Sequence, residues 1–112
     1  MTVTGTLAFV SGQVALDAEG NLVGAGDLEA QTRQALRNLE GVLVQLGATW
    51  ADVVKFGWFV TDVTEIQKVR DVRDEFLRPV LGDRPNPAST LVQVSSLFRP
   101  EFLIEVEAVV AL

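Results

Sequence analysis

Three residue types with distinctive chemistry are missing from this 112-residue chain: cysteine, histidine and tyrosine. Without cysteine there is no disulfide, no thiolate nucleophile and no thiolate zinc site, and an oxidising compartment gains no support. Without histidine the commonest general base, the commonest metal ligand and the usual serine triads are excluded. Any chemistry must therefore use carboxylates, hydroxyls, arginine, lysine, backbone amides and water.

Basic residues are also scarce. Nine lysines and arginines stand against 15 aspartates and glutamates, which gives a net charge of −6, and the basic residues are scattered along the chain. Because this charge repels a phosphate backbone, we expect no nucleic-acid partner. No apolar run approaches the ~20 residues that cross a bilayer, and residues 1–6 carry no basic charge, so neither a membrane span nor a secretory signal is expected. A cytoplasmic location follows as the default.

The sequence predicts four strands, the first from alternating apolar and polar residues and the second from its β-branched and aromatic residues. The expected strands cover residues 2–10, 53–60, 90–95 and 102–110. Gly5 marks a bend in the first of them, and Ser11, Gly12 and Gln13 interrupt it. A short hairpin is expected over 14–23, because its central polar stretch contains glycine and asparagine, which adopt positive φ at little cost.

Two segments with a period of 3.6 residues predict helices. The first begins after Asp27, a natural N-cap, and ends before Gly47, a natural C′ residue. The second begins at a capping box formed by Thr64 and Gln67 and ends near Pro79. Together with the strands, these helices predict an α+β fold in a single domain over residues 1–112.

The last predicted strand has apolar residues on both of its sides. One side carries Ile104, Val106, Ala108 and Val110, and the other carries Leu103, Glu105, Glu107, Val109 and Ala111. Two helices cover only one face of such a sheet. The second face therefore needs another cover, and a symmetric homo-oligomer is the simplest one.

A few polar residues are candidates for a site. Glu105 and Glu107 lie roughly 6 to 7 Å apart on one side of a strand, a spacing at which one carboxylate can favour protonation of the other, although an exposed or interfacial face is the commoner setting. Ser11-Gly12 lets a ligand approach the backbone closely, but is also ordinary turn chemistry. Arg73 lies inside the apolar stripe of the second helix and Arg70 at its edge. Trp58 is expected in the core.

Several short segments, in order along the chain, match one family pattern. They are Phe9–Gln13, Gln31–Asn38, Val42–Gly47, Asp52–Lys55, Pro87–Thr90 with Val92 and Val94, and Leu103–Ala108. In order and spacing, over nearly the whole chain, they resemble the Rid family. These are the reactive-intermediate deaminases, also described as endoribonuclease L-PSP or translation-inhibitor proteins.

The resemblance implies a chorismate-mutase-like fold and a homotrimer, whose sheets form a central barrel with three clefts between subunits. Typical members hydrolyse imines or enamines, the products of pyridoxal-phosphate enzymes, to 2-oxo acids and ammonia without metal or cofactor. In them an arginine fork holds the substrate carboxylate, and a glutamate near the end of the chain helps to position or activate water. By resemblance Glu105 takes this catalytic role, and Ser11, Gly12 and Leu91 line the pocket.

The chain departs from the family pattern at the deaminase motif. That motif reads Pro-Ala-Arg-Ser or Pro-Ala-Arg-Thr, whereas this chain has Pro-Ala-Ser-Thr over residues 87–90, with Ser89 in place of the arginine. The tyrosine-containing N-terminal segment of the deaminating branch is missing too. Arg70 stands at the position of a helix-two asparagine. We therefore expect 2-imino acid deaminase activity to be weak or absent, with Arg70 or Arg73 as the candidate replacement for the pocket arginine.

Two function classes remain open. The first is a deaminase-like hydrolase: a trimer that binds a small imine, enamine or carbonyl metabolite in its intersubunit clefts and hydrolyses it. The second is a non-catalytic small-molecule-binding or regulatory trimer, which the missing arginine favours. A ribonuclease is disfavoured by the acidic charge and the absence of histidine.

Overall fold

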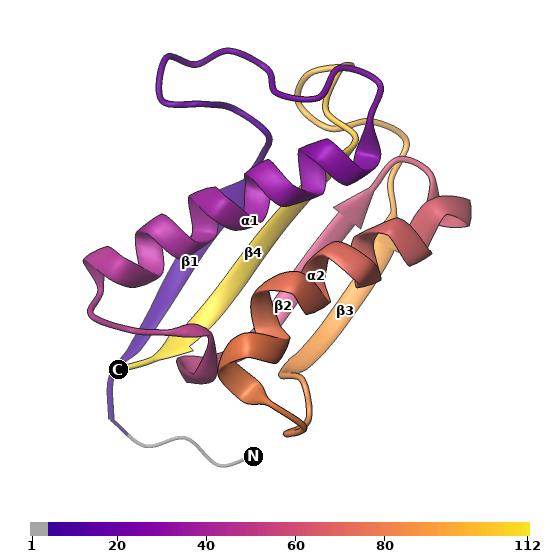
Figure 1. Cartoon of the computed structure of the whole chain (residues 1–112). Coiled ribbons are helices and arrows are strands. Elements are labelled where there is room, and N and C mark those ends of the chain that lie inside the picture. The colour runs from indigo at the N-terminus through magenta and orange to yellow at the C-terminus, as the bar shows by residue number, and fades with distance from the viewer. Residues whose placement is uncertain (1–4) are drawn as a thin grey trace.

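The computed structural model describes residues 5–112, which form a four-stranded sheet with two helices. In chain order the elements are β1 (Leu7–Gln13), α1 (Leu28–Gln45), β2 (Val53–Val60), α2 (Ile66–Leu81), β3 (Ala88–Gln93) and β4 (Ile104–Ala111), with short 3-10 turns at Trp50–Asp52 and Val63–Glu65. Both helices lie on the same face of the sheet (Figure 1). The predicted α+β architecture is confirmed. Within this part of the chain no helix combines the length and the apolar character that a membrane span requires.

The strands lie in the order β1-β4-β2-β3, so the last strand of the chain is central and β3 is an edge strand. β4 pairs antiparallel with β1 on one side and with β2 on the other. β3 pairs parallel with β2, and α2 is the crossover connection that this parallel pairing requires. The crossover places the first turns of α2 beside the edge strand β3. Part of the candidate site lies between these two elements.

Helix α1 begins and ends as its sequence predicts. The Asp27 carboxylate accepts a hydrogen bond from the backbone N–H of Ala30 at 3.1 Å, which satisfies one of the unpaired donors of the first turn. Gly47 adopts φ 70° just after the helix, the left-handed conformation that glycine tolerates at a C′ position. Both signals are local, so the sequence alone was sufficient to place them.

The start and end of α2 differ from the prediction. Thr64 and Gln67 form no capping box; instead the Asp62 carboxylate accepts hydrogen bonds from the hydroxyl and the backbone N–H of Thr64 and caps a 3-10 turn that precedes the helix. These bonds lower the pKa of Asp62. Gln67 donates to Asp71 one turn later. Pro79 does not end the helix, which continues to Leu81 before Gly82 at φ 63°.

Strand β1 extends further than its pattern suggests. Ser11, Gly12 and Gln13 were expected to interrupt the strand, but they belong to it. The register with β4 shifts between Val10 and Gln13, and pairing resumes at Gln13 after this irregularity. Residues 2–4 of the predicted strand lie outside the described residues. The expected hairpin over 14–23 is reduced to a single antiparallel bridge between Leu16 and Leu22.

The core lies between the two helices and the inward side of the sheet, and one polar side chain is sealed inside the fold. On β4 the inward residues are Ile104, Val106, Ala108 and Val110, as the alternation predicts. Gln31 of α1 is 0% exposed. Its amide nitrogen donates to the backbone carbonyls of Gly24 and Glu101 at 3.1 and 3.0 Å, and its amide oxygen accepts from the N–H of Leu103 at 2.9 Å. Gln31 thus ties α1 to the segment that leads into β4.

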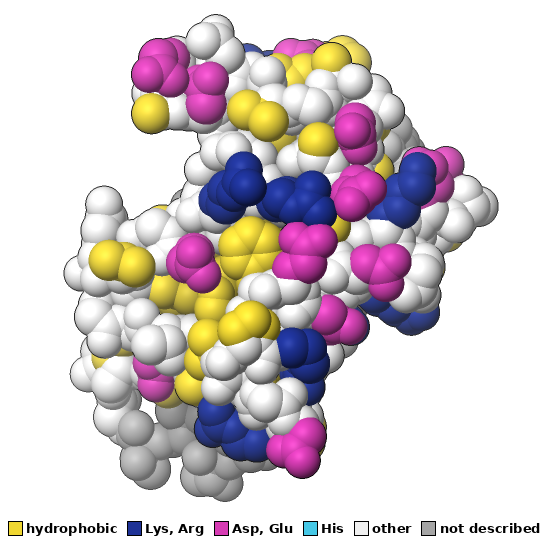
Figure 2. All heavy atoms as spheres, viewed as in Figure 1, with side chains coloured by type: hydrophobic (Ala, Val, Ile, Leu, Met, Phe, Trp, Pro, Cys, Tyr) yellow, Lys and Arg dark blue, Asp and Glu magenta, His cyan; other side chains and the backbone are white. Residues whose placement is uncertain are grey.

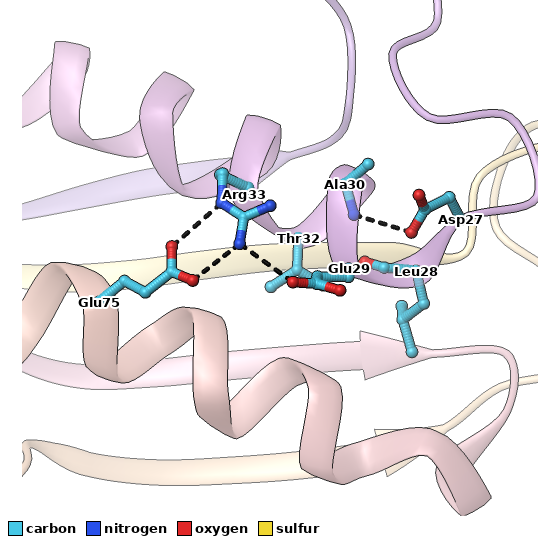
Figure 3. A network of polar contacts seen from close by, with 7 residues as sticks. All are labelled: Asp27, Leu28, Glu29, Ala30, Thr32, Arg33 and Glu75. Atoms are coloured by element: carbon cyan, nitrogen blue, oxygen red, sulfur yellow. Dashed lines mark hydrogen bonds and ion pairs between the residues drawn. The ribbon is translucent and has the colours of Figure 1, made fainter.

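An ion pair links the outer surfaces of the two helices (Figure 3). The Arg33 guanidinium donates to both carboxylate oxygens of Glu75, at 3.0 and 2.7 Å, and to Glu29 at 3.2 Å. The hydrogen bonds from Arg33 lower the pKa of Glu75, and those to Glu75 and Glu29 raise the pKa of Arg33. The pair joins α1 to α2 across the surface of the core.

We expect Gln31→Leu to lower the free energy of unfolding by at least about 2 kcal/mol, because it leaves an N–H and two carbonyls without their buried partner, at about 1 to 3 kcal/mol for an unsatisfied group. Urea unfolding at fixed protein concentration measures this. Gln45→Leu, at an exposed position at the end of the same helix, is the matched control and should change stability by less than about 0.5 kcal/mol. Equal effects for the two variants would contradict the role given to Gln31.

Glu75→Gln should lower the melting temperature at neutral pH and lose that effect in acid. The folded-state pKa of Glu75 is lowered, so its stabilisation is complete above the ordinary glutamate pKa and disappears as the pH falls through the lower folded value. Melting curves of the parent and the variant should therefore converge at acidic pH. Glu19→Gln, at an exposed turn position, is the control and should show no such convergence.

Candidate functional site

The six candidate residues lie on two opposite faces of the sheet. Arg70, Ser89 and Leu91 line one cavity on the helix-bearing face, between α2 and β3. Glu105 lies on the open face, since it alternates along β4 with the inward residues Ile104 and Val106. Its side chain lies against Gly12, and Ser11 lines a second cavity on that side of the sheet. A single chain therefore does not bring the two groups of candidates together.

The helix-side cavity has a volume of about 250 Å³ and opens beside the edge strand. Its walls come from the end of β2, the first turns of α2 and the inward side of β3. The lining residues are Trp58, Ile66, Val69, Arg70, Arg73, Ser89 and Leu91. Both arginines singled out from the sequence are therefore at this cavity, beside Ser89.

Ser89 is held in the cavity by a tryptophan. The parallel register pairs Ser89 with Phe56 and Leu91 with Trp58, and the indole N–H of Trp58 donates to the Ser89 hydroxyl oxygen at 2.9 Å. Trp58 is 3% exposed, so it is a core residue as predicted. It is also part of the cavity wall, a role that sequence reasoning missed because the pairing with Ser89 joins residues 31 positions apart.

The two arginines differ in their partners. Arg73 is half-buried and its guanidinium is bound to the neighbouring carboxylate of Asp74, with both contacts at 3.1 Å. Arg70 is exposed, and within residues 5–112 its side chain makes no hydrogen bond or ion pair. The cavity lining includes no carboxylate. Arg70 is thus the arginine whose donors are available at this cavity.

On the open face, two glycines accommodate the two glutamates of β4. A Cβ atom placed on Gly12 of β1 would lie 2.5 Å from the carboxyl carbon of Glu105, and one on Gly57 of β2 would lie 2.7 Å from an oxygen of Glu107. Because β4 lies between β1 and β2, the two side chains lean in opposite directions. Glu105 and Glu107 share one face of the sheet, as their spacing predicts, but Glu105 lies against β1 and Glu107 lies against β2.

The cavity of the open face, about 320 Å³, is lined by Phe9, Val10, Ser11, Lys55, Gly57, Glu107, Ala108 and Val109. It combines a lysine, a glutamate and a serine hydroxyl with an apolar floor. From this set the sequence singled out Ser11 and Glu107 as candidate polar residues. The others became visible only through the register of β1 and β2 against β4.

The remainder of the open face is apolar and exposed. Phe9 is 77% exposed, and Leu7 and Val92 are 41% and 42% exposed. The residues named from the sequence as needing cover, Leu103, Val109 and Ala111, are only partly exposed. The open face therefore does expose apolar surface, as the sequence indicates, but Phe9 of the edge strand β1 contributes most of it.

Within residues 5–112 no three carboxylate side chains gather in a way that could hold a metal ion. The polar groups that the two cavities offer are guanidinium, ammonium, hydroxyl and carboxylate. This set can bind an anion, orient a carbonyl or imine by hydrogen bonding, and move a proton through a carboxylate.

The family model described as Endoribonuclease L-PSP matches residues 1–112. A RutC family protein of Pyrococcus abyssi is 32% identical over 105 residues, which is 94% of this chain and 78% of that protein.

Two solved structures have the same fold. A Rid family protein of unknown function from Yersinia pestis has a TM-score of 0.87 and 35% identity, covering 100% of this chain and 83% of that one. A putative endoribonuclease of Thermotoga maritima has a TM-score of 0.83 and 36% identity, covering 97% and 81% of the two chains. With its two helices on one face of a four-stranded sheet and a family match along its full length, the chain belongs to the endoribonuclease L-PSP family, the family of the RutC and Rid proteins.

Proposed function

We propose that the chain forms a homotrimer, in which each cleft joins the helix-side cavity of one copy to the open face of the next, and that a small imine, enamine or carbonyl metabolite binds in this cleft. The observation that carries the proposal is the division of the candidate residues between two faces of one sheet. A second copy is the simplest way to bring Ser89 and Glu105 to one ligand. The exposed apolar residues of the open face supply the surface to be buried.

The reaction that suits these groups is hydrolysis of a carbon–nitrogen double bond. Water adds to the imine carbon, and one of its protons passes by way of the Glu105 carboxylate to the nitrogen, which gives a carbinolamine. The hydroxyl proton of this intermediate then passes through Glu105 to the nitrogen, the carbon–nitrogen bond breaks, and ammonia leaves as the carbonyl forms. The atoms balance as imine plus water giving carbonyl plus ammonia. Glu105 acts as general base and then as general acid, so this chemistry calls for no metal or cofactor.

A non-catalytic small-molecule-binding or regulatory trimer is the second candidate. The observation in its favour is Ser89, a neutral residue at the position where deaminating relatives are expected to carry an arginine. Such a protein would use the same cleft to bind a metabolite without turning it over. Imine turnover by the intact protein separates the two candidates.

RNA does not fit the charge of the molecule, although the family description names a ribonuclease. The net charge is −6, and on the helix-bearing face the basic side chains are interspersed with acidic ones (Figure 2). A continuous basic surface is what contact with a phosphate backbone uses. We therefore propose a metabolite as the ligand, and a cytoplasmic protein without nucleic-acid or membrane partners.

In solution we expect a trimer at micromolar concentration, measured by light scattering coupled to gel filtration. Phe9→Glu should dissociate it, because the substitution places three charges in the proposed interface at the cost of burying them. Val44→Glu, at a position 71% exposed on α1, is the matched control and should leave the trimer intact. A stable parent monomer would contradict the proposal.

Acceleration of 2-iminobutanoate hydrolysis, with the imine generated by an amino-acid oxidase, should be about 10- to 150-fold below that of an arginine-bearing relative. This range corresponds to the loss of about 1.5 to 3 kcal/mol of charge-assisted hydrogen bonding. The remaining acceleration should disappear in Glu105→Gln and persist in Glu101→Gln, an exposed position outside the site. Hydrolysis at the rate of the arginine-bearing relative would show that Ser89 is no handicap.

A further inference from the structure

We propose that Arg78 is a positioning residue: through the loop that follows α2 it fixes the place of β3, and with it the place of Ser89 in the helix-side cavity. Arg78 does not line that cavity, so it acts on Ser89 through the chain and not on the ligand. The inference rests on the proposed function only for what the cavity binds.

The Arg78 guanidinium is turned inward onto the loop over residues 82–87. One of its terminal nitrogens donates to the backbone carbonyls of Gly82 and Arg84, at 2.7 and 3.2 Å, and the other donates to the side-chain amide oxygen of Asn86. Its Nε is buried and has no hydrogen-bond partner within residues 5–112. An arginine that only covered apolar surface would keep its polar head in water, so the contacts with the loop hold this side chain in place.

Arg84, in the same loop, has a different role. Its guanidinium donates to the carbonyls of Val80 and Leu81, at 2.9 and 3.1 Å. These are among the last carbonyls of α2, which have no partner inside the helix. Arg84 therefore caps the helix, whereas the acceptors of Arg78 all lie beyond the end of α2.

A proline restricts the segment that joins the loop to β3. Pro87 has a fixed φ, and Asn86, which precedes it, is restricted to extended backbone. Ala88 begins β3 directly after Pro87. Few backbone angles are therefore free between Ser89 and the Asn86 side chain that Arg78 holds.

The edge strand β3 depends on such contacts for its place. In the part of the chain that the structure describes, it pairs with a strand on one side only. At its other end the Gln93 amide oxygen accepts the backbone N–H of Val63, in the turn before α2, at 2.9 Å. Polar contacts thus tie both ends of β3 to the two ends of α2. Because Ser89 lies at the Arg78 end of the strand, loss of the Arg78 contacts should displace Ser89 first.

The indole N–H of Trp58, which donates to Ser89, reports on the place of Ser89 in isotope-labelled protein. Arg78→Met keeps an unbranched side chain and removes the guanidinium. It should shift the Trp58 indole signal and speed the exchange of its hydrogen with solvent at least about 10-fold, because the loss of several hydrogen bonds favours local opening. The side-chain amide of Gln31, buried against the segment before β4, is the internal control and should keep its signal.

Three further variants separate positioning from stability. Arg84→Met removes the same charge from the same loop; it should lower the melting temperature, because it leaves the helix end without its cap, and leave the Trp58 indole unchanged. Asn86→Ala removes one acceptor and no charge, and should shift the Trp58 signal in the same direction by less. It also carries the test if Arg78→Met does not fold. Arg78→Lys should restore part of the parent behaviour, because a point charge does not reach all the acceptors of a guanidinium.

The inference is wrong if the Trp58 indole keeps its signal and its exchange rate in Arg78→Met, or in Asn86→Ala where Arg78→Met does not fold. It is also wrong if Arg84→Met changes them as much, since the loop would then act only through general stability. Imine turnover is a separate readout. Where the parent accelerates hydrolysis, Arg78→Met should raise KM about 2- to 10-fold with kcat little changed, as expected for the displacement of one uncharged hydrogen-bonding group. A parent without turnover contradicts the proposed hydrolysis and leaves the indole measurements to decide the role of Arg78.

Discussion

The buried amide of Gln31 is the contact on which the geometry of the sheet depends most. It is sealed from water, yet all its hydrogen bonds go to backbone groups of two segments distant in sequence, the loop before α1 and the turn before β4. A buried backbone group without a partner is costly, so these segments are held where Gln31 can reach them. β4 starts directly after Leu103, and its register with β1 and β2 determines where Glu105 and Glu107 lie.

The two faces of the sheet have different surroundings. Its inward face is closed by the helices and supplies the core, and at the edge strand it also forms one wall of the helix-side cavity. Its open face carries the two glutamates, each against a glycine of a neighbouring strand. A side chain larger than hydrogen at Gly12 or Gly57 would displace a carboxylate, so each glycine in effect selects the direction of a glutamate. The polar groups of both faces serve one ligand only if another copy of the chain completes the cleft.

Only one kind of charged group lines the helix-side cavity. Without histidine or cysteine, the charged groups available at the helix-side cavity are two guanidiniums, and only Arg70 is uncommitted within the described residues. Ser89 lines the same cavity, and the indole N–H of Trp58 holds its hydroxyl oxygen.

The sequence by itself determined the features that arise from neighbouring residues: α1 between Asp27 and Gly47, the limits of β2, and the separation of the two sides of β4. Caps, helical periodicity and strand alternation are local, so no partner is needed to recognise them. The cap before α2 is local too, but the sequence offers both Asp62 and Thr64 for it, and the structure selects Asp62. Only the tertiary structure decided that β1 continues through Gly12. It also decided that α2 brings Arg70 to Ser89. The last two depend on pairing between distant strands, and that pairing is set by the register of the whole sheet rather than by any short stretch of residues.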